Sequence, residues 1–255
     1  MTSDRVVQVQ VARGVATLTL DSPANRNALS GTMRAQLRAA LSEALADDAV
    51  RVVVLDHTGR VFCSGMDLAE AAGGGSESQG VREFPELLEL IWSSPKPVVA
   101  VVRGPARAGG VGLLAACDIV VAGSSATFAF SEVRLGLVPA VISAVVLPRM
   151  VPHVAHRLML TGRAFDAEAA AGGGLVDLVV PDADVDGELR AQLVELTAGA
   201  PSALAETKRL LRAGTSLEFD DLLELSARFF ASGEGQEGIA SFREKRAARW
   251  VPLDE

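Results

Sequence analysis

The chain has 255 residues, a formal net charge of −8 at pH 7 and an apolar fraction of 49%. These values predict a globular protein of one large domain or two small ones, and the negative charge argues against nucleic acid or an anionic membrane surface as the main partner. No apolar run reaches the length of a membrane span and the N-terminus lacks a signal-peptide pattern, so we expect a cytoplasmic protein. Two cysteines are too few for a disulfide framework or a zinc cluster, and we expect no metal site.

The N-terminal part of the chain predicts a hairpin followed by a helix. Residues 6–12 and 15–20 alternate in polarity on either side of Arg13-Gly14, which is typical of a tight hairpin turn. Ser30 is expected to cap the helix that follows. The apolar face predicted for this helix consists of Met33, Leu37, Ala40, Leu41, Ala44 and Leu45, with Arg34, Arg38 and Glu43 lying off it.

Two junctions of the same kind follow, each a buried strand that leads into a turn of small residues. Residues 51–55 lead to Ser64-Gly65-Met66-Asp67, and residues 98–102 lead to Ala108-Gly109-Gly110. Glycines in such turns can leave backbone N–H groups free at the start of a helix, where the helix dipole favours an anion or a polarised oxygen. Two such amides could together hold one oxyanion. Asp67 is expected to cap a helix rather than to take part in catalysis.

The remaining elements divide the chain into two parts. Residues 71–80, AAGGGSESQG, contain no large apolar side chain that a core could bury. We expect them to form a mobile segment, either a lid or a plain surface loop. A helix with apolar positions at residues 87–92 ends at Pro95. Beyond His153 helical patterns dominate, so we expect strands and helices in the N-terminal half and an all-helical C-terminal third.

Most candidate catalytic motifs are absent or incomplete. The glycine-rich turn contains no G-x-G-x-x-G, which argues against a dinucleotide site, and Phe62 stands where the first glycine of a G-x-S-x-G serine motif would be. Cys63 is more typical of core than of a nucleophile. Glu132 follows the apolar segment 126–130, and a carboxylate in such surroundings should have a raised pKa that suits proton transfer near neutral pH. A partly exposed loop glutamate is the alternative.

Five segments, in this order and spacing, resemble the enoyl-CoA hydratase/isomerase or crotonase superfamily: PANRNALS, FCSGMDL, KPVVAVVRGPARAGGVGLLAACDIVVA, FAFSEVRLGLVPA and EGIASFREKRAARW. The resemblance implies an α/β fold, with a crotonase-like spiral of ββα units over residues 1–200 and a helical C-terminal trimerisation region over residues 201–255. It implies a homotrimer or a dimer of trimers. Coenzyme A would enter as part of an acyl-CoA substrate, so no separate cofactor is expected.

The resemblance also implies roles for individual residues. The thioester oxygen would be held by the backbone N–H groups of Met66 and Gly109, the two junctions identified above. The positions implied to contact coenzyme A are Arg26, Ala28, Ser64 and Leu68, joined from a neighbouring subunit by Phe242 and Lys245. Glu132 matches the second of two glutamates usual in hydratases of the family, whereas Gly112 stands in place of the first and is expected at the substrate-binding site.

Three functions remain open at this point. The leading hypothesis is a hydratase that adds water to a 2-enoyl-CoA, with a branched or carboxylated acyl chain as one option and Glu132 as general acid and base. A Δ3,Δ2-enoyl-CoA isomerase is the first alternative, because one carboxylate can both remove and return a proton. An inert paralogue that only binds acyl-CoA is the second, and the presence of Glu132 argues against it.

Overall fold

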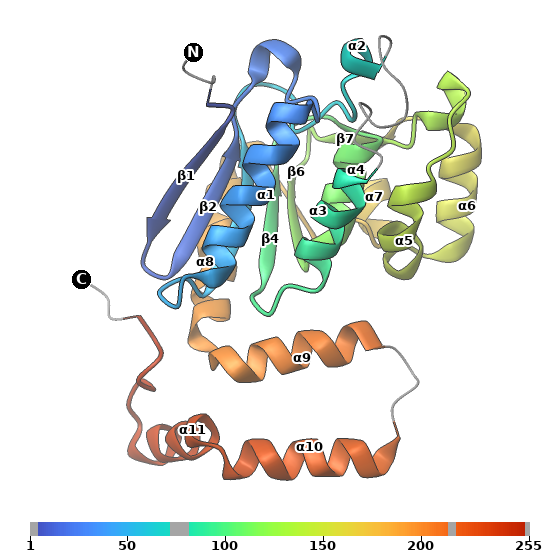
Figure 1. Ribbon diagram of the computed structural model, residues 1–255. Helices are drawn as coiled ribbons and strands as arrows, with labels where there is room; N and C mark the ends of the chain where they lie inside the picture. Colours follow the sequence, from blue (N-terminus) through green and yellow to red (C-terminus); the bar gives the residue numbers. More distant parts are fainter. Residues whose placement is uncertain (1–4, 72–81, 214–217, 253–255) are drawn as a thin grey trace.

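The structure, a computed structural model, describes residues 5–71, 82–213 and 218–252, and a twisted six-stranded sheet lies at its centre (Figure 1). The strand order is β1-β2-β3-β4-β6-β9. Only the pair β1 and β2 is antiparallel, and the other neighbours run parallel. The bounds of these strands are β1 Val7–Ala12, β2 Val15–Leu20, β3 Val52–His57, β4 Val98–Val102, β6 Ile119–Gly123 and β9 Leu178–Val180.

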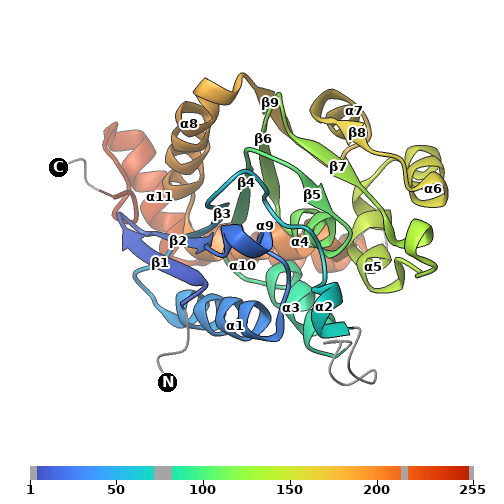
Figure 2. The ribbon, with the colours of Figure 1, turned by 90° about the horizontal axis from the view of Figure 1, so that it is seen from above.

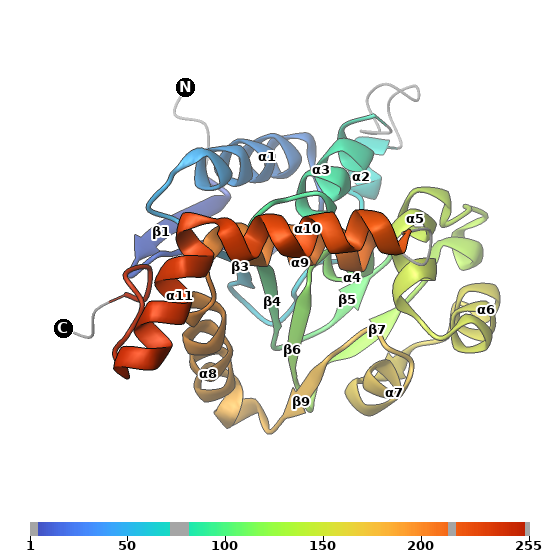
Figure 3. The ribbon, with the colours of Figure 1, turned by 90° about the horizontal axis from the view of Figure 1, so that it is seen from below.

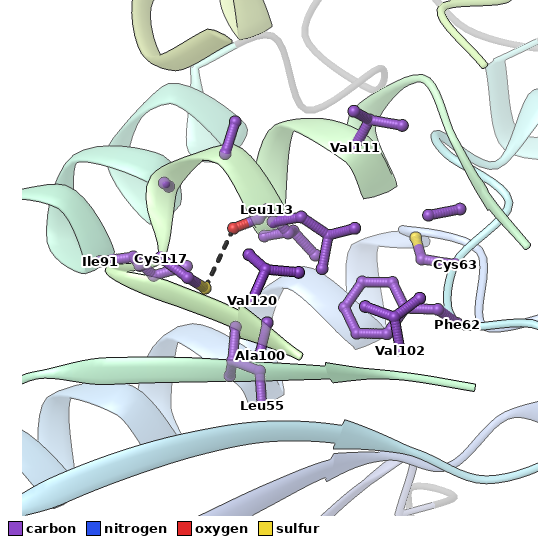
Figure 4. Packing of buried hydrophobic residues seen from close by; sticks show 14 of the residues in the cluster. Leu55, Phe62, Cys63, Ile91, Ala100, Val102, Val111, Leu113, Cys117 and Val120 are labelled. Carbon is purple, nitrogen blue, oxygen red and sulfur yellow. Dashed lines mark hydrogen bonds between the residues drawn. The ribbon is translucent and has the colours of Figure 1, made fainter. Parts of the chain in front are cut away.

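Helices cover both faces of this sheet (Figure 2). One face packs against α1 (Gly31–Ala46), α3 (Glu83–Trp92) and α4 (Gly109–Ala116), and the other packs against α8 (Val185–Ala198). Figure 4 shows the first of these cores, with Leu55, Ala100 and Val120 of the sheet beneath Leu113 of α4. Buried on both faces, β4 is an uninterrupted apolar run, as expected of a central parallel strand.

A second, three-stranded sheet lies beside the first and completes the N-terminal body. It consists of β5 (Ala106–Arg107), β7 (Thr127–Ala129) and β8 (Phe165–Asp166). The helices on this side are α5 (Ala140–Arg149), α6 (Pro152–Thr161) and α7 (Ala167–Gly172). Short helices fill the connections: η1 (Pro23–Asn25), α2 (Leu68–Ala71), η2 (Glu132–Leu135) and η3 (Asp182–Asp184).

Local sequence determines the first turn and the first cap as predicted. Arg13 and Gly14 both have positive φ, 49° and 76°, which is the conformation of the tight turn that joins β1 to β2. Ser30 Oγ accepts a hydrogen bond of 3.2 Å from Met33 N and caps α1. Of the segment predicted to be mobile, residues 71–80, Ala71 is the last residue of α2, and residues 72–80 lie outside the described residues.

The expectation of an all-helical C-terminal third is wrong. Two short strands interrupt the helices there: β8 pairs with β7, and β9 adds a parallel edge strand to the main sheet beside β6. Each strand is too short to show an alternating pattern. The sequence of Leu178–Val180 does not distinguish a strand from the helices around it, because the pairing with β6 is not visible in the sequence.

The last three helices form a layer below the two sheets (Figures 1 and 3). They are α9 (Pro201–Ala213), α10 (Phe219–Ala231) and α11 (Gly233–Glu244). A buried ion pair attaches α9 to the core, because Lys208 Nζ lies 2.8 Å from Asp118 Oδ2 and donates to Ile91 O at 3.1 Å. The carboxylate of Asp118 also accepts a hydrogen bond of 2.8 Å from Val98 N. No helix in the described part of the chain is long and apolar enough to cross a bilayer.

One arginine connects the C-terminal segment to the start of β3. The guanidinium of Arg51 donates to the carbonyl oxygens of Thr197 at 3.3 Å and Gly199 at 2.6 Å, and also to that of Trp250. Trp250 in turn donates from its indole nitrogen to Ala198 O at 2.9 Å. The end of α8, the C-terminal segment and the third strand are therefore joined at one point.

Candidate active site

A cavity of about 290 Å³ lies where the two glycine-containing junctions meet η2 and α5. Several predicted site residues line it together: Ser64, Met66, Leu68, Gly109 and Glu132. They come from segments far apart in the sequence, and the parallel order of β3 and β4 brings the two junctions to the same edge of the sheet. Ligand sites in parallel sheets commonly lie at this carboxyl edge.

The first junction follows β3 and is held by a short pairing with the chain before α1. Leu29 N donates to Gly65 O at 2.8 Å, and Leu29 and Met66 form an isolated parallel bridge. Gly65 has φ of +92°, and a Cβ there would lie 3.1 Å from Ala108 Cβ. The two junctions therefore pack directly against each other. The N–H of Met66 donates to no atom in the described part of the chain.

The second junction follows β4 and leads into α4. Ala108 precedes the helix with φ of 46° and ψ of −116°, an unusual conformation for a residue other than glycine that costs about 1–3 kcal/mol. Its amide is held by Ala129 O at 2.9 Å, and its carbonyl accepts from Gly112 N at 3.1 Å. Gly109 is the first residue of α4, and its N–H, like that of Met66, has no acceptor among the described residues.

Two unbonded amides on one cavity, one of them at a helix N-terminus, are the arrangement that stabilises a developing oxyanion. Asp67, next to Met66, has the capping role expected of it: its carboxylate accepts from Ala69 N at 2.9 Å at the start of α2. Asn25 also donates to Asp67 at 2.8 Å. Asp67 also lines the cavity, and these bonds fix its carboxylate and stabilise the turn that presents the Met66 amide.

Glu132 supplies a buried carboxylate to the same cavity. Its side chain is 9% exposed, and among the described residues Oε2 has no hydrogen-bond partner. Burial raises the pKa of Glu132 above its ordinary value, because the charged form loses hydration. The turn that closes η2 holds its backbone, since Leu137 N donates to Glu132 O at 3.0 Å. A carboxylate in this state can exchange a proton with a bound molecule.

Gly112 lies one turn further along α4, where a neighbouring side chain takes the space beside it. A Cβ on Gly112 would overlap Ile142 Cγ2 and lie 3.1 Å from Ile142 Cβ. A glutamate at this position has no room while Ile142 is in place. The carboxylates on α3 do not replace it: Glu83 and Glu86 pair with arginines of α1, and neither lines the cavity.

Arg34 is one of the cavity residues that were not predicted from the sequence. It was expected to lie off the apolar face of α1, yet it is 5% exposed, and Nη1 donates to Leu29 O at 2.6 Å. Its Nε lies 3.1 Å from Glu83 Oε2, and the side chain lines the cavity. The spacing of Arg34 to Leu37 and Leu41 is i, i+3 and i+7, a helical pattern that could have predicted its burial.

The other predicted residues lie outside this cavity in a single chain. Arg26 is exposed, and its carbonyl accepts from Ser64 N at 3.1 Å, whereas Ala28 is buried beneath the turn. Phe242, 86% exposed, and Lys245, at the C-terminal end of α11, lie in the lower helical layer, away from α2, α4 and α5 (Figure 1). One protomer alone does not bring these last two residues to the cavity.

Within the described residues no cluster of histidine, cysteine and acidic side chains could hold a metal ion. His57 has a structural role, because its Nε2 accepts from Arg103 N at 3.1 Å. Cys63 is fully buried, and burial raises the pKa of its thiol to about 12, so it remains a protonated core residue near neutral pH.

The chain is similar to known proteins along almost its whole length. The model of the family described as enoyl-CoA hydratase/isomerase matches residues 10–252. A Thermus thermophilus protein provisionally named as an enoyl-CoA hydratase is 38% identical over 252 residues, which cover 95% of this chain and 100% of the relative. The Mycobacterium tuberculosis enoyl-CoA hydratase EchA19 is 35% identical over 245 residues, 90% of each chain.

A solved structure agrees with these sequence relatives. Pseudomonas aeruginosa AtuE superposes with a TM-score of 0.91 at 36% identity, covering 97% of this chain and 100% of that one. The spiral α/β fold with additional C-terminal helices is therefore the fold of these proteins. The chain belongs to the enoyl-CoA hydratase/isomerase family, the crotonase superfamily.

Proposed function

We propose that the protein is an enoyl-CoA hydratase that adds water across the double bond of a 2-enoyl-CoA thioester. The observation that carries this proposal is the carboxylate of Glu132, buried and with one oxygen unpartnered, on the same cavity as the unbonded amides of Met66 and Gly109. Hydration needs these two functions together, a group that moves protons and a site that stabilises negative charge on the thioester oxygen.

In the proposed reaction the thioester oxygen accepts hydrogen bonds from the amides of Met66 and Gly109. Glu132 takes a proton from a water molecule while the water oxygen bonds to the β-carbon, and negative charge develops on the thioester oxygen. Glu132 then returns the proton to the α-carbon, and the double bond is replaced by one C–O and one C–H bond. The substrate carries its own coenzyme A, and no other cofactor is needed for this chemistry.

The lining of the cavity favours a hydrocarbon acyl group. Its walls include Leu68, Phe84, Leu135, Val138 and Ile142, and burial of apolar surface against such walls is favourable. Arg34 is the cation on this lining, and its charge is already paired with Glu83. A carboxylated acyl chain would have to compete with that pair.

Isomerisation of a 3-enoyl-CoA is the second candidate. It is favoured by the apolar side chain of Ile142 beside Gly112, which leaves Glu132 without a second carboxylate at that wall. A single carboxylate can move a proton between two carbons, and no water needs to be held. The two reactions have different products, so a direct assay separates them.

The test is incubation of the wild-type protein with 2-enoyl-CoA and 3-enoyl-CoA substrates, straight and carboxylated, with products identified by mass spectrometry. We expect 3-hydroxyacyl-CoA from the 2-enoyl substrates. Formation of 2-enoyl-CoA from 3-enoyl-CoA without hydration would assign the isomerase instead. Binding of saturated acyl-CoA without turnover of either substrate would assign an inert binding protein.

Glu132→Gln tests the role of the carboxylate. The amide keeps the shape of the side chain but cannot exchange the proton, so kcat should fall about 10²- to 10⁴-fold while the affinity for saturated acyl-CoA is retained. Glu86→Gln is the matched control, because Glu86 is an exposed carboxylate on α3 paired with Arg38. Substantial turnover by Glu132→Gln would contradict the mechanism.

We also propose that the active form is a homotrimer or a dimer of trimers. The proposal is supported by large apolar side chains exposed on α10, namely Phe219, Leu223 and Phe230. The stripe of Leu222, Leu225 and Phe229 is half-buried and faces α9 across a second cavity. A partner subunit could bring Phe242 and Lys245 to a site that they do not reach in their own chain. Light scattering that finds only monomer at micromolar concentration would contradict this assembly.

A further inference from the structure

We propose that Ile142 determines the acyl selectivity of the cavity, by limiting the bulk that can lie beside Glu132, and that it holds this position because residue 112 is glycine. The consequence is a preference for acyl groups that are straight at the carbons next to the thioester over acyl groups with a methyl branch there. This inference rests on the proposed acyl-CoA site and adds a substrate class to it.

The backbone conformation of Gly112 does not require glycine. It lies in the middle of α4, its φ is not positive, and glycine inside a helix costs about 1 kcal/mol relative to alanine. Its surroundings give the reason instead: a Cβ there would overlap Ile142 Cγ2 and lie 3.6 Å from Phe84 Cζ. Ile142 therefore packs directly on the backbone of α4.

The side chain of Ile142 is held in place and cannot move away from a bulky substrate. Isoleucine is branched at Cβ, and this restricts the rotation about χ1 in a helix. Ile142 lies in α5 with 3% of its surface exposed. The backbone of α4 at Gly112 blocks it on one side, while its remaining surface lines the cavity that contains Glu132. A branch that points at this side chain meets a fixed wall.

The selectivity is measured as the ratio of the values for the straight-chain and the branched acyl group. The ratio is determined once for the affinity of saturated thioesters and once for kcat/KM of the matching 2-enoyl-CoA. The pair of saturated probes is butyryl-CoA and 2-methylbutyryl-CoA. Wild type should prefer the straight chain, and Ile142→Ala should raise the relative kcat/KM of the branched substrate about 10- to 200-fold, the usual discrimination in an apolar pocket between substrates that differ by one methyl or methylene group. Ile142→Val, which disturbs the fold least, should shift the ratio in the same direction by less.

Val145→Ala is the matched control. Val145 lies on the same helix and is equally buried, but it does not line the cavity. It should lower the thermal midpoint without changing the ratio. An unchanged ratio in both Ile142 variants, or a similar change in Val145→Ala, overturns the inference.

The dependence on Gly112 is tested by combining substitutions. Gly112→Ala should lower the thermal midpoint in the wild-type background, where its Cβ meets Ile142, and should lower it much less when Ile142→Ala is also present. Equal losses in both backgrounds contradict the proposed coupling. Failure of wild type to bind any acyl-CoA would refute the proposed function, whereas binding with an unchanged ratio in the Ile142 variants would refute only this inference.

Discussion

Each of the two junctions presents one unbonded amide to the cavity, but different contacts hold the two amides in place. The amide of Gly109 stands at the start of α4, whose eight residues are all buried between the sheet and α5. The amide of Met66 depends on a short bridge to Leu29 and on the positive φ of Gly65. The core of the protein therefore fixes the amide of Gly109, whereas a local turn that packs against the second junction fixes the amide of Met66.

The largest effect is expected when the donor at the second junction is removed. Gly109→Pro deletes the N–H at a helix position where the proline ring itself is acceptable, and loss of one oxyanion donor should lower kcat by about 10²- to 10³-fold. Gly109→Ala is the control, because it keeps the N–H and adds the same Cβ as proline, which would lie 3.0 Å from Leu29 Cδ1 and 3.2 Å from Phe84 Cζ. A folded Gly109→Pro enzyme with nearly full activity would show that this amide does not hold the substrate.

Gly65→Ala tests whether the first junction leans on the second. Alanine is strained at φ of +92°, and its Cβ would press on Ala108, so the free energy of unfolding should fall by about 1–3 kcal/mol. Turnover should fall as well, because both amides move. Urea denaturation measures the first effect, and Gly172→Ala, where the added Cβ meets nothing within 4 Å, is the control. An unchanged stability would mean that the junctions are independent.

The pH dependence separates the amides from the carboxylate. Glu132 must be ionised to accept a proton from water, so kcat/KM should fall as the pH falls through its raised pKa, above the ordinary value of 4.5. The substitutions at Gly65 and Gly109 carry no titrating group and should lower the plateau without moving this acid limb. A shifted limb in either variant would show that the junctions also control the hydration of Glu132.

The raised pKa of Glu132 also affects the stability of the fold, and stability should change with pH in the opposite direction to kcat/KM. Between the ordinary and the raised pKa the unfolded chain has released the proton that the folded protein still holds, so stability decreases as the pH rises through this window. Above it, Glu132→Gln should be at least as stable as wild type, and below pH 4.5 this advantage should disappear. Thermal midpoints across this range provide the measurement.

The smallest effect is expected from Met66→Ala. The donor at this position is a backbone group, so turnover should stay close to that of wild type while the shape of the acyl pocket changes. A steady-state comparison of kcat and KM over acyl chain length checks this. A loss as large as that of Gly109→Pro would mean that the Met66 side chain, not the turn, positions its amide.

Sequence patterns predicted the elements whose causes are local. The glycine turns, the Ser30 cap and the apolar run of β4 each follow from neighbouring residues, and the polarity around Glu132 predicted the direction of its pKa. The features that were missed depend on partners distant in the sequence. The strand β9 forms because it can pair with β6. The contact between α4 and α5 depends on Ile142 packing against Gly112, which has no side chain. Arg34 was the exception, because its helical spacing already indicated burial.

The carbonyl cluster around Arg51 has a consequence for the time course of synthesis. Arg51 and Trp250 are 199 positions apart, and a ribosome adds about 5–20 residues each second, so about 10–40 s separate the arrival of this cation from that of its last acceptor. During that interval the guanidinium can bond at most to the carbonyl oxygens of Thr197 and Gly199, which are made before Trp250. In the nascent chain this corner therefore closes in two steps, first to the end of α8 and then to the segment around Trp250.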